Sequence, residues 1–293
     1  MTRPIWIISV VLITLPVFAK SKPVSIPFTT NSDGMVIVPA TLGATIPMHV
    51  ILDTGAGVDV IAPSLIEKVH GRPAGQFTGF RMWGERLDIA LFIVPEISVG
   101  PVVKKDALVG TWDVLDQLHL DGIVAVNDFR RQPFTLDFAN KRLVFETEKS
   151  LRGRKADGSL VPLQTDDRRG ITLDLFSHFT FGKQTGQCEI DTGSPRATIS
   201  TRYMGDLGID KDAKGVRKQE HKTIAGAAVV NYWTTIPQIS LAAAPQVSLA
   251  PAQVAFSDIV YDCVIGVDFW HARAVTINIP DRQLIVSPAS NAP

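Results

Sequence analysis

Short runs of apolar and β-branched residues alternate with turn-forming residues along most of the chain. Gly, Pro, Asn or Asp bounds each run, as is typical of β-strands. The runs predict strands at residues 35–42, 48–52, 87–94 and 134–145. Helical spacing is limited to short segments, and we expect one or two turns at residues 63–69, 112–118 and 201–207. The pattern therefore predicts a mainly β fold.

The second half of the chain repeats the first. Three segments recur in the same order at offsets of 138, 142 and 141 residues: Asp53-Thr54-Gly55 as Asp191-Thr192-Gly193, residues 94–99 as 236–241, and residues 121–145 as 262–286. Matches at so constant an offset indicate a tandem duplication of a unit of about 140 residues, with a small drift from insertions in surface loops. We therefore expect two lobes related by a pseudo-twofold axis.

The join between the two units lies in the most charged stretch of the chain, residues 146–170. Such a stretch is typical of a solvated connection, within which the apolar residues 161–163 could already begin the second lobe. We place the boundary after residue 149, so that the lobes comprise residues 20–149 and 150–293.

The composition is that of a globular protein with a sizeable core, because 45% of the residues are hydrophobic and 20% are charged. Lys plus Arg and Asp plus Glu both number 29, so the formal net charge is zero. The chain has no excess of basic residues of the kind that binds nucleic acid or an anionic membrane surface. We expect neither as a partner.

The N-terminus, residues 1–19, has the pattern of a secretory signal peptide. Arg3 supplies a positive charge, residues 5–18 form an apolar run, and Val17-Phe18-Ala19 offers a cleavage site. The run is shorter than the about 20 residues that cross a bilayer. We expect an exported protein, periplasmic or secreted, that begins near Lys20 and has no membrane span after cleavage. An uncleaved N-terminal anchor is the alternative.

The chain has two cysteines, Cys188 and Cys263. After export such a pair can form one disulfide, and the alternative is two buried free thiols. Composition and spacing leave both possibilities open.

Each copy of the Asp-Thr-Gly motif follows an apolar segment. A strand that ends in this motif can turn sharply at its glycine and leave the carboxylate at the tip of the loop. One such loop is most simply a surface turn, but two at equivalent positions of a duplicated unit would bring Asp53 and Asp191 face to face across the pseudo-twofold axis. Two close carboxylates cannot both be charged, so one keeps a proton while the other acts as a base.

A pair of this kind can activate a water that attacks a peptide carbonyl, while the protonated carboxyl stabilises the developing oxyanion. The six histidines show no metal-ligand spacing, and no serine-nucleophile elbow or phosphate-binding glycine loop is present. The predicted chemistry needs neither a metal nor another cofactor.

The sequence resembles the retropepsin-like aspartic proteases, in the bacterial form with a signal peptide and two fused lobes. Asp53-Thr54-Gly55-Ala56 is similar to the retroviral active-site tetrad, and Asp191-Thr192-Gly193-Ser194 to the pepsin version. Val264-Ile265-Gly266 matches the second signature of the family, as does Ile123-Val124-Ala125 except for its last residue. The resemblance implies a bilobal pepsin/retropepsin-like acid protease fold with two pseudo-twofold-related β-barrel lobes. Ala125 in place of glycine predicts crowding behind the Asp53 loop.

The resemblance also assigns roles to individual residues. Thr54, Gly55, Ala56, Thr192, Gly193 and Ser194 would support the two active-site loops. A β-hairpin flap in each lobe would cover the substrate, at residues 80–84 and 223–227, and its substrate-binding residues would be Trp83, Gly84, Ile224, Ala225 and Gly226. Neither flap carries the tyrosine found in pepsins. In the family fold the strands of Cys188 and Cys263 run side by side, which implies a disulfide between them.

The predicted function is that of an aspartic endopeptidase that hydrolyses extended peptide or protein substrates with an Asp53/Asp191 dyad. Because one chain supplies both aspartates, a monomer would suffice. A non-catalytic protein that binds peptides in the same bilobal cleft is the alternative. Within the dyad, a hydrogen bond from Ser194 would favour ionised Asp191, whereas the Ala56 side chain can donate none, so we expect Asp53 to hold the shared proton.

Overall fold

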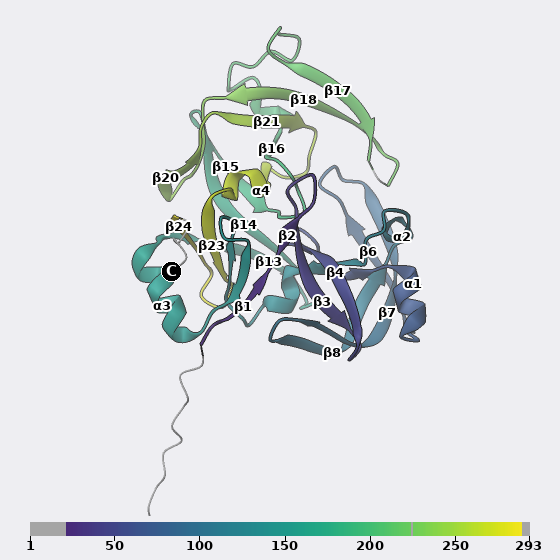
Figure 1. Ribbon diagram of the computed structural model, residues 1–293. Helices are drawn as coiled ribbons and strands as arrows, with labels where there is room; N and C mark the ends of the chain where they lie inside the picture. Colours follow the sequence, from purple (N-terminus) through teal and green to yellow (C-terminus); the bar gives the residue numbers. More distant parts are fainter. Residues whose placement is uncertain (1–21, 224, 289–293) are drawn as a thin grey trace, which may run out of the picture.

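The computed structural model describes residues 22–223 and 225–288, which form three β-sheets (Figure 1). Strands hold 53% of the chain and helices 12%. The mainly β class predicted from the sequence is therefore confirmed. The predicted signal peptide, residues 1–19, lies outside the described residues.

The first half of the chain forms an eight-stranded sheet in the order β2-β3-β4-β9-β5-β8-β7-β6. Two neighbouring pairs are parallel, β4 with β9 and β5 with β8, and the other neighbours are antiparallel. The strand bounds are β2 Thr29–Thr30, β3 Val36–Leu42, β4 Ile46–Asp53, β5 Val60–Ile61, β6 Arg72–Phe80, β7 Arg86–Val99, β8 Val102–Thr111 and β9 Gly122–Ala125.

The second half forms a ten-stranded sheet with the same central arrangement. Its order is β17-β18-β21-β16-β22-β15-β14-β19-β20, with β13 paired to β14. The parallel pairs are again two, β15 with β22 and β16 with β21. The bounds are β13 Gln164–Arg168, β14 Thr172–Phe181, β15 Gln184–Ile190, β16 Thr198–Ser200, β17 Arg217–Lys222, β18 Ala228–Ile236, β19 Ile239–Leu241, β20 Ala244–Leu249, β21 Ala252–Ser257 and β22 Cys263–Ile265.

A six-stranded sheet joins the two halves, in the order β1-β11-β10-β23-β24-β12. At its centre Thr135 of β10 pairs with Thr276 of β23, and their hydroxyl oxygens lie 2.6 Å apart. These residues are equivalent in the sequence repeat, so the local twofold axis passes between them. The bounds are β1 Val24–Pro27, β10 Phe134–Asp137, β11 Arg142–Phe145, β12 Ser159–Pro162, β23 Arg273–Asn278 and β24 Gln283–Pro288.

The helices are short, as the sequence predicts. The predicted segments contain α1 Pro63–Lys68, α2 Val114–Gln117 and the 3-10 helix η2 Thr201–Tyr203. Two further short helices, η1 Val126–Phe129 and α4 Val267–Trp270, follow the second signature in each repeat. Within the described residues no helix is long and apolar enough to cross a membrane.

Two segments differ from expectation. Residues 134–145, predicted as one strand, form the hairpin β10–β11, because the chain turns at Lys141, whose φ is +52°. The charged connection contains a ten-residue helix, α3 Glu148–Asp157, which has no buried residue. Thr147 caps this helix together with Ser150, so local hydrogen bonds rather than an apolar face stabilise it. The boundary between residues 149 and 150 falls within α3 and stays a prediction.

Candidate active site

The two aspartates lie at the ends of equivalent buried strands. Asp53 is the last residue of β4, and Asp191 directly follows β15. Each strand is held by its parallel neighbour and by one carboxylate that repeats in the sequence: Asp121 accepts from the His49 N–H at 2.7 Å, and Asp262 from the Gln187 N–H at 2.8 Å. Aspartate therefore occurs at this position in both repeats because each one binds the strand that leads to an aspartate of the pair.

The threonines of the two motifs exchange hydrogen bonds across the axis. Each hydroxyl accepts from the backbone N–H of the other threonine at 3.0 Å. The Thr54 hydroxyl also donates to the Ile190 carbonyl, and the Thr192 hydroxyl to the Leu52 carbonyl, both at 2.6 Å. Both threonines are buried. This reciprocal set of four bonds fixes the two loops relative to each other.

Each aspartate lies against the glycine of the opposite loop. A Cβ atom on Gly55 would come within 2.7 Å of the Asp191 Cγ, and one on Gly193 would collide with the Asp53 carboxylate. The same glycines bind the aspartate of their own loop, because the Gly55 N–H donates to Asp53 at 2.9 Å and the Gly193 N–H to Asp191 at 2.8 Å. The structure thus brings the two predicted carboxylates together.

Burial raises the pKa of both aspartates above the usual value. The pKa of Asp53 is lowered in part by a hydrogen bond from the Asp191 side chain, by the N–H groups of Gly55 and Ala56, and by the positive charge of Arg81. The negative charge of Asp53 raises the pKa of Asp191 further, well above its usual value. The two carboxyl groups therefore titrate as a pair, which keeps a proton to higher pH than an isolated carboxyl group would.

The expectation that Asp53 holds the shared proton stays a prediction. The Ser194 hydroxyl does favour the ionised form of Asp191, as predicted, but the burial of Asp191 and the charge of Asp53 outweigh it. The side chain of Ala56 donates nothing, yet its backbone N–H stabilises ionised Asp53.

A cleft of about 460 Å³ contains both aspartates; residues 80–83 of the first predicted flap line it, and the second hairpin lines it through His221, Asn231 and Trp233. The first flap is the tip between β6 and β7, and the second is the tip between β17 and β18. In both tips the N–H of the first residue, Arg81 or Thr223, donates to the carbonyl of the residue four positions later. Gly84 and Gly226 occupy the same position in the two turns, with φ of +74° and +97°.

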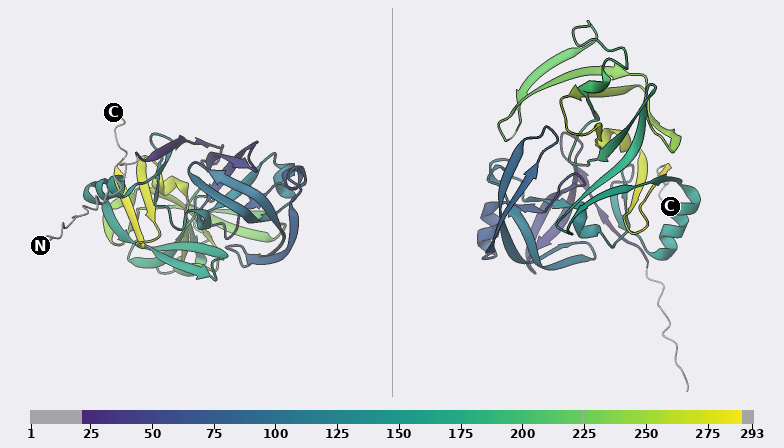
Figure 2. Two further views of the ribbon diagram at one scale, coloured as in Figure 1. Left: turned by 90° about the horizontal axis from the view of Figure 1, so that it is seen from below. Right: turned by 180° about the vertical axis from the view of Figure 1, so that it is seen from behind.

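The two hairpin tips meet, as the right-hand view of Figure 2 shows. The Glu85 carboxylate accepts from the Thr223 hydroxyl at 3.0 Å and from the Ala227 N–H at 3.1 Å. Of the predicted flap residues, Ala225 and Gly226 lie in the turn of the second hairpin, and Ile224 lies outside the described residues. These hydrogen bonds to the Glu85 carboxylate therefore join the tips of the two hairpins.

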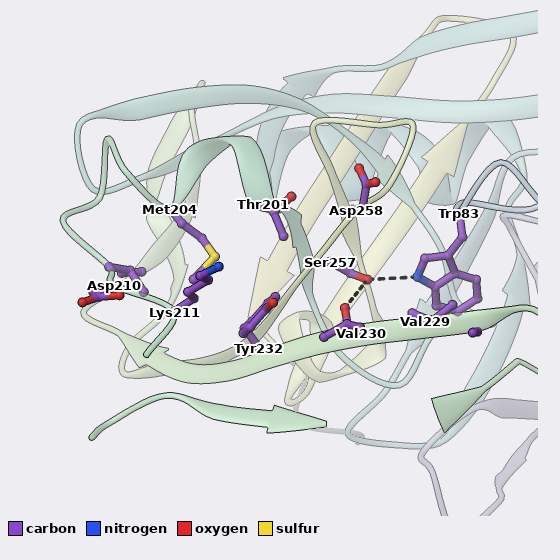
Figure 3. Close-up of a pocket in the computed structure, with 12 residues that line it drawn as sticks. Trp83, Thr201, Met204, Asp210, Lys211, Val229, Val230, Tyr232, Ser257 and Asp258 are labelled. Carbon is purple, nitrogen blue, oxygen red and sulfur yellow. Dashed lines mark hydrogen bonds between the residues drawn. The ribbon is translucent and has the colours of Figure 1, made fainter. Parts of the chain in front are cut away.

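Trp83 connects the first hairpin to the second lobe. Its indole N–H donates to the Ser257 hydroxyl at 3.1 Å, and the Val260 N–H donates to the Met82 carbonyl at 2.8 Å. The ring borders the cleft and also a neighbouring pocket of about 780 Å³, where it lies at one end and Met204 and Tyr232 lie farther along (Figure 3). Trp83 therefore anchors its hairpin across the lobes.

Arg81 is a cleft residue that the sequence analysis did not single out, although it lies in the predicted flap. Its guanidinium is within electrostatic reach of Glu85 and of both aspartates, and its Nη1 is buried without a hydrogen-bond partner among the described residues. The sequence offered one signal for this role: Arg81 is a cation within the predicted flap, directly after the apolar residue Phe80.

Ala125 lies behind the Asp53 loop, next to a buried charge cluster. Its N–H donates to Asp59 at 2.8 Å, and Lys104 bridges Asp59 and Asp128 at 3.2 and 2.7 Å. Burial and the charge of Asp128 raise the pKa of Asp59 to about 7, against the opposing charge of Lys104. At the equivalent position in the second lobe, Gly266, a Cβ atom would lie 2.6 Å from the Ser194 carbonyl oxygen, so alanine would not fit there without a shift of the backbone.

The disulfide between Cys188 and Cys263 is present and joins the adjacent parallel strands β15 and β22. Both residues are buried directly behind the Asp191 loop. The predicted pairing is confirmed. In the described part of the chain, no group of three or more His, Cys, Asp or Glu side chains is arranged to hold a metal ion.

Comparisons with known proteins identify the fold. No protein-family model matches the chain, and no curated protein matches it in sequence. Among solved structures it is similar to basic 7S globulin from soybean, with a TM-score of 0.55 and 9% sequence identity over 90% of this chain and 94% of the globulin. The globulin has the bilobal fold of the pepsin-like aspartic proteases, a family with inactive members. The predicted bilobal fold is confirmed, and at this identity the likeness shows the fold alone.

Proposed function

We propose that the protein is an aspartic endopeptidase of the retropepsin-like type, with Asp53 and Asp191 as its catalytic dyad. The reciprocal hydrogen bonds of Thr54 and Thr192 carry the proposal, because they hold two acidic loops in a fixed face-to-face arrangement. A structural role alone would not require the carboxylates to lie within the cleft. The duplicated family signatures support the retropepsin-like type.

In the proposed reaction ionised Asp53 takes a proton from a water that attacks the peptide carbonyl. Protonated Asp191 donates to the carbonyl oxygen, on which negative charge develops. The N–H groups of Gly55 and Ala56 and the charge of Arg81 favour ionised Asp53, which supports this division of roles. Thr54, Gly55, Thr192, Gly193 and Ser194 position the pair.

An extended substrate would lie beneath the two hairpins, with Trp83, Gly84, Ala225 and Gly226 near it. Backbone of the hairpins can pair with such a segment by strand addition. One chain supplies both aspartates, so the proposed active form is a monomer. The proposed location is periplasmic or secreted, with the N-terminus cleaved or, as the alternative, retained as an anchor. The disulfide supports export, because such bonds persist in oxidising compartments.

The test is incubation of the purified protein with a diverse peptide mixture from pH 3 to 8, with and without pepstatin. Wild type should cleave, and the isosteric variants Asp53→Asn and Asp191→Asn should each lose at least about 1,000-fold in kcat/KM while keeping the cooperative unfolding of wild type. Substantial hydrolysis by either purified variant would refute the dyad.

The same experiment tests the alternative function, a non-catalytic protein that binds peptides. This alternative is favoured by the existence of inactive members among pepsin-like proteins. It predicts that wild type retains peptides but cleaves none at any pH.

A further inference from the structure

Glu189 is a third carboxyl group in the cleft, and the sequence analysis assigned it no role. It lies on β15 two residues before Asp191, so the two side chains share one face of the strand. The residue is only 4% exposed, yet it lines the cleft together with the dyad. No hydrogen bond or ion pair joins its carboxylate to any residue in the described part of the chain. Its oxygens are not among the fully buried polar atoms that lack a partner, so they face the open space of the cleft, within reach of a ligand.

The charges that act on the pKa of Glu189 are negative, although Arg81 and Arg196 line the same cleft. Burial raises the pKa of Glu189 well above its usual value, and the charges of Asp191, Asp174 and Asp53 raise it further. Arg81 acts on the dyad and on Glu85, and Arg168 acts on Asp174. This end of the cleft therefore combines acidic groups with a lack of any cation acting on Glu189.

Aromatic rings lie beside the carboxyl group. Phe176 on β14 is the strand partner of Glu189, and the Tyr261 ring packs edge-on against Phe176 with ring centroids 5.7 Å apart. Tyr261 also lines the cleft, and its own pKa is raised by burial and then by the charges of Glu189 and Asp174. Tyr261 and the Glu189 carboxyl group line the same cleft, a combination that suits a side chain with an aliphatic stem and a cationic head.

We propose that Glu189 determines substrate specificity by binding the Lys or Arg side chain of a peptide at a position next to the scissile bond. The stem of that side chain packs against Tyr261, and its ammonium or guanidinium group forms an ion pair with the Glu189 carboxylate. The inference rests on the proposed function for its link to cleavage. The inference concerns which peptides bind in the cleft, so a peptide-binding measurement can test it separately from hydrolysis.

The first experiment maps cleavage sites in a proteome-derived peptide library generated with a protease that cuts after Glu, which leaves Lys and Arg inside the peptides. Wild type should show Lys or Arg enriched at one position next to the scissile bond. A pair of peptides that differ only by Lys or norleucine there should differ in kcat/KM by about 10-fold or more, since a hydrogen bond to a charged group is lost. Glu189→Gln should bring that ratio close to one.

The control is Glu148→Gln, the same chemical change on a 96% exposed side chain of α3, which should keep the wild-type ratio. Glu189→Gln is nearly isosteric and removes a charge that burial disfavours, so thermal unfolding should show no loss of stability. If that variant fails to fold, Glu189→Leu, which removes the charge and fits an apolar pocket, gives the same comparison.

The second experiment does not depend on hydrolysis. Immobilised Asp53→Asn protein is incubated with the same library, and the retained peptides are compared with those retained by Asp53→Asn/Glu189→Gln. Enrichment of Lys or Arg that depends on Glu189, without cleavage by wild type, would uphold the specificity site and refute the peptidase. Cleavage with no basic preference, or with a preference unchanged by Glu189→Gln, would overturn the inference while leaving the proposed function intact. Retention with no preference that depends on Glu189 would overturn the inference whether or not wild type cleaves.

Discussion

The reciprocal threonine bonds predict a large and symmetric loss of stability when either hydroxyl is removed. Thr192→Val keeps the shape of the side chain but removes the acceptor of the Thr54 N–H and the donor to the Leu52 carbonyl. Thr192 is only 2% exposed, so neither backbone group regains a water partner easily. An unpaired buried group costs about 1–3 kcal/mol, which gives a loss of about 2–6 kcal/mol in the free energy of unfolding.

Thr54→Val should cost about the same, because it leaves the Thr192 N–H and the Ile190 carbonyl unpaired. The control is Thr192→Ser, which keeps both hydrogen bonds and removes one methyl group, at a cost of about 1 kcal/mol. The double variant Thr54→Val/Thr192→Val should lose less than the sum of the single losses if the two loops separate once one half of the set is broken.

The assay is urea denaturation of the four variants and wild type, with kcat/KM measured on one peptide under native conditions. Loss of loop position should lower kcat/KM in both valine variants, since Leu52 and Thr54 flank Asp53. A Thr192→Val protein no less stable and no less active than Thr192→Ser would refute the reasoning. It would mean that the four bonds do not fix the two loops.

Two further predictions follow from the same region. The Cys188–Cys263 disulfide closes a loop of 75 residues, which corresponds to about 4.5 kcal/mol of stabilisation in the chain-entropy relation. The variant Cys188→Ala/Cys263→Ala should therefore unfold at a much lower urea concentration than wild type. An unfolding midpoint within error of wild type would contradict this prediction. Arg81→Gln should shift the acidic limb of the kcat/KM–pH profile to higher pH, because loss of the cation raises the pKa of Asp53. The control Arg72→Gln, at an exposed arginine, should leave the profile unchanged. An acidic limb that does not move in Arg81→Gln would show that Arg81 does not stabilise ionised Asp53.

The fold class and the pairing of the two aspartates could be predicted from the sequence because the chain is duplicated. A strand with an acidic turn at its end is uninformative alone, but Asp53 and Asp191 at equivalent repeat positions imply a symmetric meeting point. The disulfide needed the family resemblance as well, since Cys188 and Cys263 become neighbours only when β15 and β22 pair in parallel.

Two local elements were harder to predict. The helix α3 has charged residues throughout and depends on the Thr147 cap, so the hydrophobic pattern carried no signal for it. The hairpin β10–β11 was read as one strand, because apolar residues continue on both sides of its turn and the pattern does not show where the chain reverses.

The electrostatics of the cleft was decided by the tertiary structure alone. The pKa shift of Asp53 depends on the charge of Arg81, which acts from the tip of a hairpin, and on burial, which no local pattern reports. Glu189 reads in the sequence as one polar residue in a strand, and only the packing of β14, β15 and Tyr261 makes it a buried carboxyl that lines the cleft. Residue type and periodicity are local properties that the sequence carries by itself. A pKa depends on desolvation and on charges from distant parts of the chain, which exist only once the lobes have closed around the site.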